Sequence, residues 1–221
     1  MIYLLAAFVF AALTAWATWK QNRGLEFVAK PAVMVVLFFH LWTSVEMQGA
    51  PLWFGLGILF SLLGDVLLLW LDRMFLYGLA AFLFAQIFYV IGFNSPPSPF
   101  TAWSAIMAIL IGWGSARVLR QILSALMEKG NARMRIPVTV YGTIITLMLL
   151  SAMLKLADIS WDANASLLVA LGAFLFYLSD IVLAWLKFVT PIQNGRIINI
   201  GLYRLGQIAL VAGVVMQYQQ S

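Results

Sequence analysis

Apolar residues fill eight long stretches of this 221-residue chain, and polar residues are concentrated in the short gaps between them. A helix needs about 20 mostly apolar residues to cross the hydrocarbon core of a bilayer. The candidate stretches are residues 2–19, 30–45, 52–71, 74–93, 100–119, 136–155, 164–186 and 197–217. The gaps are rich in Gly, Pro, Asn and Ser, which are typical of turns. The pattern therefore predicts an all-α membrane protein in which one bundle of eight transmembrane helices forms a single domain over residues 1–221.

The composition supports this assignment to the membrane. Hydrophobic residues make up 64% of the chain and charged residues only 10%, and the mean hydropathy is +0.98. A soluble domain of this size could not bury so much apolar surface. The absence of cysteine excludes disulfides, thiolate metal sites and a cysteine nucleophile, and the single histidine, His40, excludes a three-histidine zinc centre. We therefore expect no metal and no cofactor.

Basic residues indicate how the bundle is oriented. Most of the 13 Lys and Arg residues fall near the odd-numbered connections between the predicted helices. They are Lys20, Arg23, Lys30, Arg73, Arg117, Arg120, Lys129, Arg133, Arg135, Lys187 and Arg196. By the positive-inside rule these connections face the cytoplasm, so both termini lie outside, on the periplasmic side of a bacterial inner membrane. We expect this basic surface to bind anionic lipid headgroups, and the sequence has no motif for binding nucleic acid.

Two aspartates interrupt the apolar stretches, and their local sequences resemble each other. Asp65 lies in the segment Gly57–Trp70, and Asp180 lies at the matching position of the segment Gly172–Trp185. A carboxylate at such depth costs roughly 3 kcal/mol in hydrocarbon, so it is typical of chemistry, ion passage or a specific buried pair. The pattern predicts that both carboxylates belong to one site and face one another across a dry pocket.

A second similarity, around Gln86 and Gln207, extends the repeat. Ala85-Gln86-Ile87 resembles Gly206-Gln207-Ile208, which makes the first four helices correspond to the last four. The chain would then consist of two halves, 1–96 and 97–221, whose corresponding helices run in the same direction. Polar residues from both halves would meet at the centre of the bundle.

Ionisable groups from three predicted helices lie at one depth. Asp65 and Asp180 each lie seven residues before the charged residue that ends their apolar stretch, or about 10 Å at 1.5 Å per residue. Arg204 lies about 12 Å from the same edge by this measure. Polar residues one helical turn from these groups are Ser61, Tyr177, Tyr203 and Gln207. Lys30 is expected at the cytoplasmic mouth of the second helix, with its ammonium group at headgroup level.

Each of these residues also has a purely structural interpretation. Asp65 or Asp180 would then pair with Arg204 and hold the bundle together, as buried ion pairs do at little net gain in stability. The two glutamines would make hydrogen bonds between helices, and His40 would be a packing residue. The residues alone do not decide between these interpretations.

Several short motifs follow one another in a characteristic order. They are Lys30-Pro31, Ser61-Leu62-Leu63-Gly64-Asp65, Tyr77-Gly78-Leu79-Ala80-Ala81-Phe82 followed by Tyr89, Leu175-Phe176-Tyr177-Leu178-Ser179-Asp180, and Tyr203-Arg204-Leu205-Gly206-Gln207. In this order and spacing, over nearly its whole length, the chain resembles the YhhN-like lysoplasmalogenases, a family of eight-helix membrane proteins. One departure is Gln86, three residues before Tyr89, where the family often has a histidine. No proton-transfer role is therefore assigned to this position.

The resemblance implies hydrolysis of the vinyl ether bond of a lysoplasmalogen, which gives a fatty aldehyde and glycerophospho-ethanolamine or glycerophospho-choline. An acid must protonate the distal alkene carbon, and water then captures the oxocarbenium ion. We expect one of Asp65 and Asp180 to be the general acid and the other to stabilise the cation and activate water; which is which stays open. The expected substrate-binding residues are Lys30 and Arg204 for the phosphate, and Tyr177, Tyr203, Gln207 and Gln86 for water or glycerol hydroxyls. Tyr89 and Ser61 are also expected to bind the substrate.

Two other classes of protein are alternatives. A proton-coupled transporter of small solutes or lipids is also built from duplicated halves with carboxylates near the middle of the membrane. A non-catalytic lipid-binding protein would use the two aspartates for stability alone. Release of aldehyde from a lysoplasmalogen would distinguish the enzyme from both.

Overall fold

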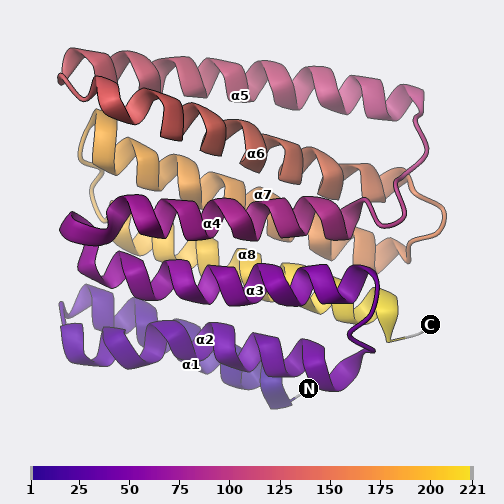
Figure 1. Cartoon of the computed structure of the whole chain (residues 1–221). Coiled ribbons are helices and arrows are strands. Elements are labelled where there is room, and N and C mark those ends of the chain that lie inside the picture. The colour runs from indigo at the N-terminus through magenta and orange to yellow at the C-terminus, as the bar shows by residue number, and fades with distance from the viewer. Residues whose placement is uncertain (1, 220–221) are drawn as a thin grey trace.

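In the computed structural model, which describes residues 2–219 except for the side chains of residues 71–73, the chain forms one bundle of long helices (Figure 1). The helices are α1 (Ile2–Trp19), α2 (Arg23–Ser44), α3 (Ala50–Leu67), α4 (Leu71–Phe93), α5 (Ala102–Glu128), α6 (Arg135–Leu154), α7 (Ala163–Ala184) and α8 (Gly195–Tyr218). In this described part, eight helical segments are long and apolar enough to cross a membrane. The prediction of an all-α, eight-helix membrane fold is therefore confirmed.

Helix α2 begins seven residues earlier than the apolar pattern predicts, at Arg23 instead of residue 30. Asn22 caps it, because its side-chain oxygen accepts a hydrogen bond of 3.1 Å from the backbone N–H of Leu25. Pro31 thus lies inside the helix and not at its start. Lys30 consequently lies about 10 Å along the helix, at 1.5 Å per residue, and not at its mouth.

Helix α5 is longer than predicted, since it continues to Glu128 instead of ending at residue 119. The apolar pattern ends just before Arg120, but the helix continues through this residue, in a segment of residues that favour helix. Only 6% of the apolar window of α5 is buried, compared with 56% of that of α8. Helix α5 therefore lies at the edge of the bundle and α8 lies inside it (Figure 1).

Helices α7 and α8 approach each other closely through glycines. A Cβ atom on Gly172 would lie 2.5 Å from the backbone nitrogen of Leu210, and one on Gly206 would lie 2.9 Å from the carbonyl oxygen of Gly172. Small residues at such a contact allow two backbones in a membrane to pack directly together. The contact fixes the position of α7, which carries Asp180, against α8, which carries Arg204.

The two ends of the chain lie on one side of the bundle, since the first turn of α1 and the last turn of α8 are at the same end (Figure 1). Which side of the membrane this is stays a prediction, and Arg73, which contributes to it, has a side chain outside the description. Helix α2 contacts α8, and α6 contacts α4. In the predicted repeat α2 corresponds to α6 and α8 corresponds to α4, so the two contacts would be equivalent. The relation between the halves 1–96 and 97–221 also stays a prediction.

Candidate active site

Asp65 on α3 is the centre of a buried ionic cluster. Asp65 is only 1% exposed. Its Oδ2 atom accepts hydrogen bonds from Nη1 of Arg204 at 2.8 Å and from the hydroxyl of Tyr203 at 3.2 Å. The Nζ atom of Lys30 lies 3.8 Å from Oδ1. Three helices, α2, α3 and α8, thus supply one carboxylate and two cations. In such a cluster two cations lie close enough to compensate the charge of a carboxylate.

The ionic cluster continues into a chain of neutral hydrogen bonds. The hydroxyl of Tyr89 on α4 donates to Oε1 of Gln207 at 2.9 Å, and Nε2 of Gln207 donates to Oγ of Ser61 at 3.2 Å. The structure therefore brings most of the predicted site residues together. They are Lys30, Ser61, Asp65, Tyr89, Tyr203, Arg204 and Gln207.

The prediction that the ammonium group of Lys30 reaches headgroup level is wrong. Its side chain is only 12% exposed and points to Asp65. The reason is the early start of α2, which places Lys30 two helical turns inside the helix. From there a nearby carboxylate compensates the charge better than a long reach to the membrane surface does.

Asp180 on α7 has different surroundings. Its Oδ2 accepts a short hydrogen bond from the hydroxyl of Tyr141 on α6, and Ser179 donates to its Oδ1 at 3.4 Å. Among the described residues, no Lys or Arg forms an ion pair with it. The residue is largely buried, although it is more exposed than Asp65. Asp180 thus has hydroxyl donors where Asp65 has cations.

The sequence analysis missed Tyr141. It lies in an apolar stretch with no motif around it, yet one signal was available. Tyr141 follows Arg135, at the start of α6, by six residues, which is about 9 Å and close to the depth estimated for Asp65 and Asp180. Depth alone, without sequence similarity, would have selected it.

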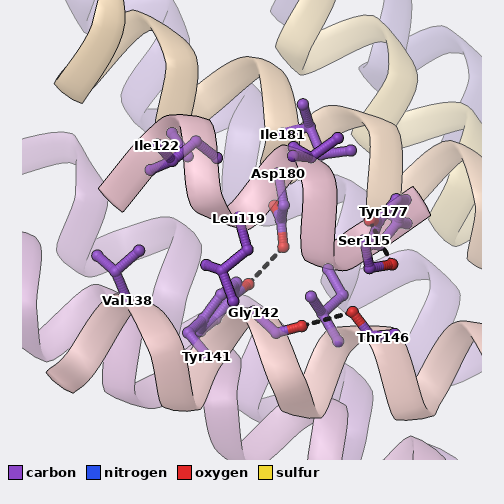
Figure 2. Close-up of a pocket in the computed structure, with 13 residues that line it drawn as sticks. Ser115, Leu119, Ile122, Val138, Tyr141, Gly142, Thr146, Tyr177, Asp180 and Ile181 are labelled. Carbon is purple, nitrogen blue, oxygen red and sulfur yellow. Dashed lines mark hydrogen bonds between the residues drawn. The ribbon is translucent and has the colours of Figure 1, made fainter. Parts of the chain in front are cut away.

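Asp180 lies where two small cavities meet. The lateral cavity, of about 60 Å³, lies between α5, α6 and α7, and Figure 2 shows Asp180 and Tyr141 pointing toward one another across it. The inner cavity, of about 40 Å³, is formed by apolar side chains that include Leu68, Phe82 and Leu183. Both cavities are lined by Asp180 and Tyr141.

A third and larger cavity carries charge. This basic vestibule, of about 200 Å³, is lined by Glu26, Lys30, Leu68, Leu183, Leu186, Lys187, Arg196, Asn199 and Ile200. It adjoins the inner cavity, because Leu68 and Leu183 line both. Nη2 of Arg196 donates to both carboxylate oxygens of Glu26, at 2.7 and 2.8 Å, while 52% of the Arg196 side chain is exposed. Glu26 and Arg196 are further residues that the sequence analysis did not place in the site.

The two aspartates therefore do not share one pocket as expected. Asp180 lines two of the three cavities, whereas Asp65 is not among the described residues that line any of them. Nor do they share a hydrogen-bond or ion-pair partner among these residues. Tyr203 is the nearest link, because it donates to Asp65 while its ring packs edge-on against Phe82 of the inner cavity, with ring centres 5.6 Å apart.

The last two predicted residues lie apart from the ionic cluster. Tyr177 lines the lateral cavity and donates to Oγ of Ser115 on α5 at 2.7 Å. Gln86 is fully buried and approaches the hydroxyl of Tyr141, but neither of its amide atoms has a hydrogen-bond partner among the described residues. The same is true of Nε and Nη2 of Arg204. Buried polar atoms without partners are uncommon, and they mark positions where a ligand or water can bind.

Comparison with known proteins gives the family. Residues 25–214 match the model of the YhhN family. The chain is 30% identical to lysoplasmalogenase TMEM86B of Mus musculus over 94% of its own length and 84% of that protein, and 26% identical to lysoplasmalogenase TMEM86B of Homo sapiens over 93% and 84%. It is also 29% identical to lysoplasmalogenase TMEM86A of Homo sapiens, over 72% of this chain and 63% of that protein. No solved structure matches the chain. The extent of the family match shows that the chain belongs to the YhhN family.

Proposed function

We propose that this protein is a lysoplasmalogenase, which hydrolyses the vinyl ether bond of a lysoplasmalogen to a fatty aldehyde and glycerophospho-ethanolamine or glycerophospho-choline. Its similarity to proteins of that name, over most of both chains, supports the reaction class. The observation that carries the proposal is the pair formed by Asp180 and Tyr141 where the inner and lateral cavities meet. A lipid bound there would bring its ether bond to a carboxyl group.

Asp180 is the better candidate for the general acid. A group that delivers a proton must be able to carry one, and burial without a cation allows a carboxyl group to do so. Asp65 is less suited to this role, because two cations, Arg204 and Lys30, lie beside its carboxyl group. The unequal surroundings of the two aspartates therefore favour a division of roles, with Asp180 as the acid.

The reaction then takes place in three steps. Asp180 gives its proton to the distal alkene carbon, and the electrons of the double bond form the new C–H bond, which leaves an oxocarbenium ion. Water adds to the carbon bound to oxygen and returns a proton to the Asp180 carboxylate, so that a hemiacetal forms. The hemiacetal then collapses: its hydroxyl group loses a proton, the bond between carbon and the glycerol oxygen breaks, and the glycerol oxygen takes up a proton, which leaves the aldehyde and the alcohol. Tyr141 stabilises the carboxylate while it is charged, by donating a hydrogen bond.

The buried amide of Gln86 is suited to orient the attacking water. It lies beside Tyr141 and has a donor and an acceptor that are both without partners among the described residues. An amide can hold a water molecule without accepting its proton. This role agrees with the absence of a histidine at this position of the sequence.

The basic vestibule is suited to the substrate phosphate. Lys30 and Arg196 line it, and the exposed guanidinium of Arg196 can reach a headgroup. Arg204 is less suited, because it is 1% exposed and already paired with Asp65. Asp65 then holds Lys30 and Arg204 in position instead of reacting itself. By the positive-inside rule the vestibule faces the cytoplasm and its anionic lipids, with both termini periplasmic and the protein in a bacterial inner membrane.

The proposal is tested by offering the purified protein a lysoplasmalogen and its saturated-ether analogue. Free aldehyde should appear from the first substrate only, because the saturated ether has no alkene carbon to protonate. Aldehyde from neither substrate would refute the reaction. Uptake of the lipid into proteoliposomes without cleavage would instead favour a transporter.

A further inference from the structure

The lateral cavity has the form of a binding site for a hydrocarbon chain. It lies between α5, α6 and α7, and its walls are mainly apolar. Apolar side chains that line it are Val118, Leu119 and Ile122 of α5, Val138 and Ile145 of α6, and Ile181 of α7. Figure 2 shows these walls around the Asp180 and Tyr141 side chains.

The polar groups of the lateral cavity are already engaged with one another. Tyr177 donates to Ser115 at 2.7 Å, and Thr146 donates at 2.6 Å to a backbone carbonyl one turn earlier. Tyr141 donates to the Asp180 carboxylate. A ligand with hydrogen-bonding groups would have to break these bonds, whereas a hydrocarbon chain would leave them intact.

The position of the lateral cavity makes it reachable from the lipid. Helix α5 lies at the edge of the bundle with 6% of its apolar window buried. Val118 and Leu119 on α5, and Ile181 on α7, are partly exposed although they line the cavity. A chain that extends from the cavity would therefore continue along α5 into the bilayer.

We propose that the lateral cavity binds the part of the alkenyl chain next to the vinyl ether. This proposal rests on the proposed function of the protein. The substrate would lie with its phosphate in the basic vestibule, its ether bond at Asp180, and the first carbons of its chain between α5 and α6. The cavity is small, so the rest of the chain lies in the bilayer. Gly142 and Leu119 then set the room available to the chain, since a Cβ atom on Gly142 would lie 3.1 Å from Cδ1 of Leu119.

The first experiment fills the cavity and compares two chain lengths. Purified wild type and Gly142→Leu are given 1-hexadecenyl and 1-propenyl glycerophospho-ethanolamine, and the ratio of the two kcat/KM values is measured. The kcat/KM for the hexadecenyl lipid divided by that for the propenyl lipid should fall about tenfold in Gly142→Leu. This change corresponds to about two methylene groups displaced from apolar surface. Gly112→Leu is the matched control, because it adds the same side chain to α5 where nothing lies within 4 Å. An unchanged ratio in folded Gly142→Leu would overturn the assignment.

The second experiment requires neither turnover nor a variant. A saturated-ether lysolipid with a diazirine on its third chain carbon is photolysed with the wild-type protein, and the labelled peptides are identified by mass spectrometry. Labelling of α5, α6 and α7 around the cavity, removed by excess unlabelled lysolipid, is expected. Labelling that maps to other helices, or that excess lysolipid does not reduce, would overturn the site. If labelling is as expected but the wild type releases no aldehyde, the chain site stands and the proposed reaction fails.

Discussion

Asp65 and Asp180 lie in similar stretches of sequence, but the structure gives them opposite surroundings. Asp65 receives Arg204, Lys30 and Tyr203 from the helices around it and is fully buried. Among the described residues, Asp180 receives hydrogen bonds from hydroxyl groups alone, above all that of Tyr141, and it borders two cavities. The neighbouring helices, and not the local motif, therefore decide which charges and hydrogen-bond donors surround each carboxylate.

The largest effect is expected for Asp180→Asn. An amide cannot deliver the proton, so turnover of a lysoplasmalogen should fall by about a thousandfold, as is usual for loss of a general acid. The free energy of unfolding should stay unchanged or rise, because removing a buried carboxyl from an active site commonly does so. Aldehyde release and thermal unfolding in detergent measure the two quantities. A variant that kept full turnover would remove Asp180 from the mechanism.

Asp65→Asn should mainly affect stability. It leaves Arg204 and Lys30 buried without a carboxylate, and breaking such a cluster costs about 3 kcal/mol or more. The double variant Asp65→Asn with Arg204→Gln should lose less free energy of unfolding than the two single variants lose in sum, because both members of the ion pair are removed together. Denaturant unfolding of the single and double variants measures this coupling. A thousandfold loss of turnover in stable, folded Asp65→Asn would instead make Asp65 a reacting group and equate the two aspartates.

Tyr141→Phe should lower kcat by about tenfold, because one hydrogen bond to a charged carboxylate is worth about 1.5 kcal/mol or more. KM should change little, since the ring is kept. Tyr177→Phe is the matched control, as it also removes one hydroxyl from the lateral cavity but leaves Asp180 untouched. Equal losses in the two variants would show that the hydroxyl of Tyr141 acts by packing and not through Asp180.

The smallest effect on turnover is expected at Asp158, a buried aspartate outside the helices. Burial raises the pKa of Asp158, but hydrogen bonds from Ser160, Lys155 and Ser98 outweigh it, so that the pKa lies below its ordinary value of 3.8. The stability that this lowered pKa contributes is fully present at pH values above the pKa of Asp158 in the unfolded chain. It is lost as the pH falls through the lower pKa of Asp158 in the folded protein. Any pH dependence of turnover near neutrality therefore cannot come from Asp158.

Asp158→Asn separates a structural aspartate from a reacting one. It should lower the free energy of unfolding by about 1 kcal/mol, because Lys155 loses its charged partner at 3.0 Å. Turnover per folded molecule should stay within about twofold of wild type, a margin below 0.5 kcal/mol. Thermal unfolding and aldehyde release, measured on the same preparation, check both. A large loss of turnover at unchanged stability would contradict this assignment.

The eight helices can be predicted from the sequence alone, because a run of apolar residues has a large free energy of transfer into lipid whatever its neighbours are. The sequence also predicts a common depth for Asp65, Asp180 and Arg204, since the rise of a helix is fixed, but it misplaced the ammonium group of Lys30. The errors came where a local signal was misread, at the Asn22 cap and at the arginines inside α5.

Which side chains share a partner depends instead on how the helices pack. Arg204 and Lys30 pair with Asp65 and not with Asp180, and Tyr141 reaches Asp180 from a stretch without any motif. These contacts depend on the rotation and spacing of packed helices, set by side chains far apart in the chain, such as the glycines that join α7 to α8. Periodicity along one helix contains no information on that rotation, so the different surroundings of the two aspartates are visible only in three dimensions.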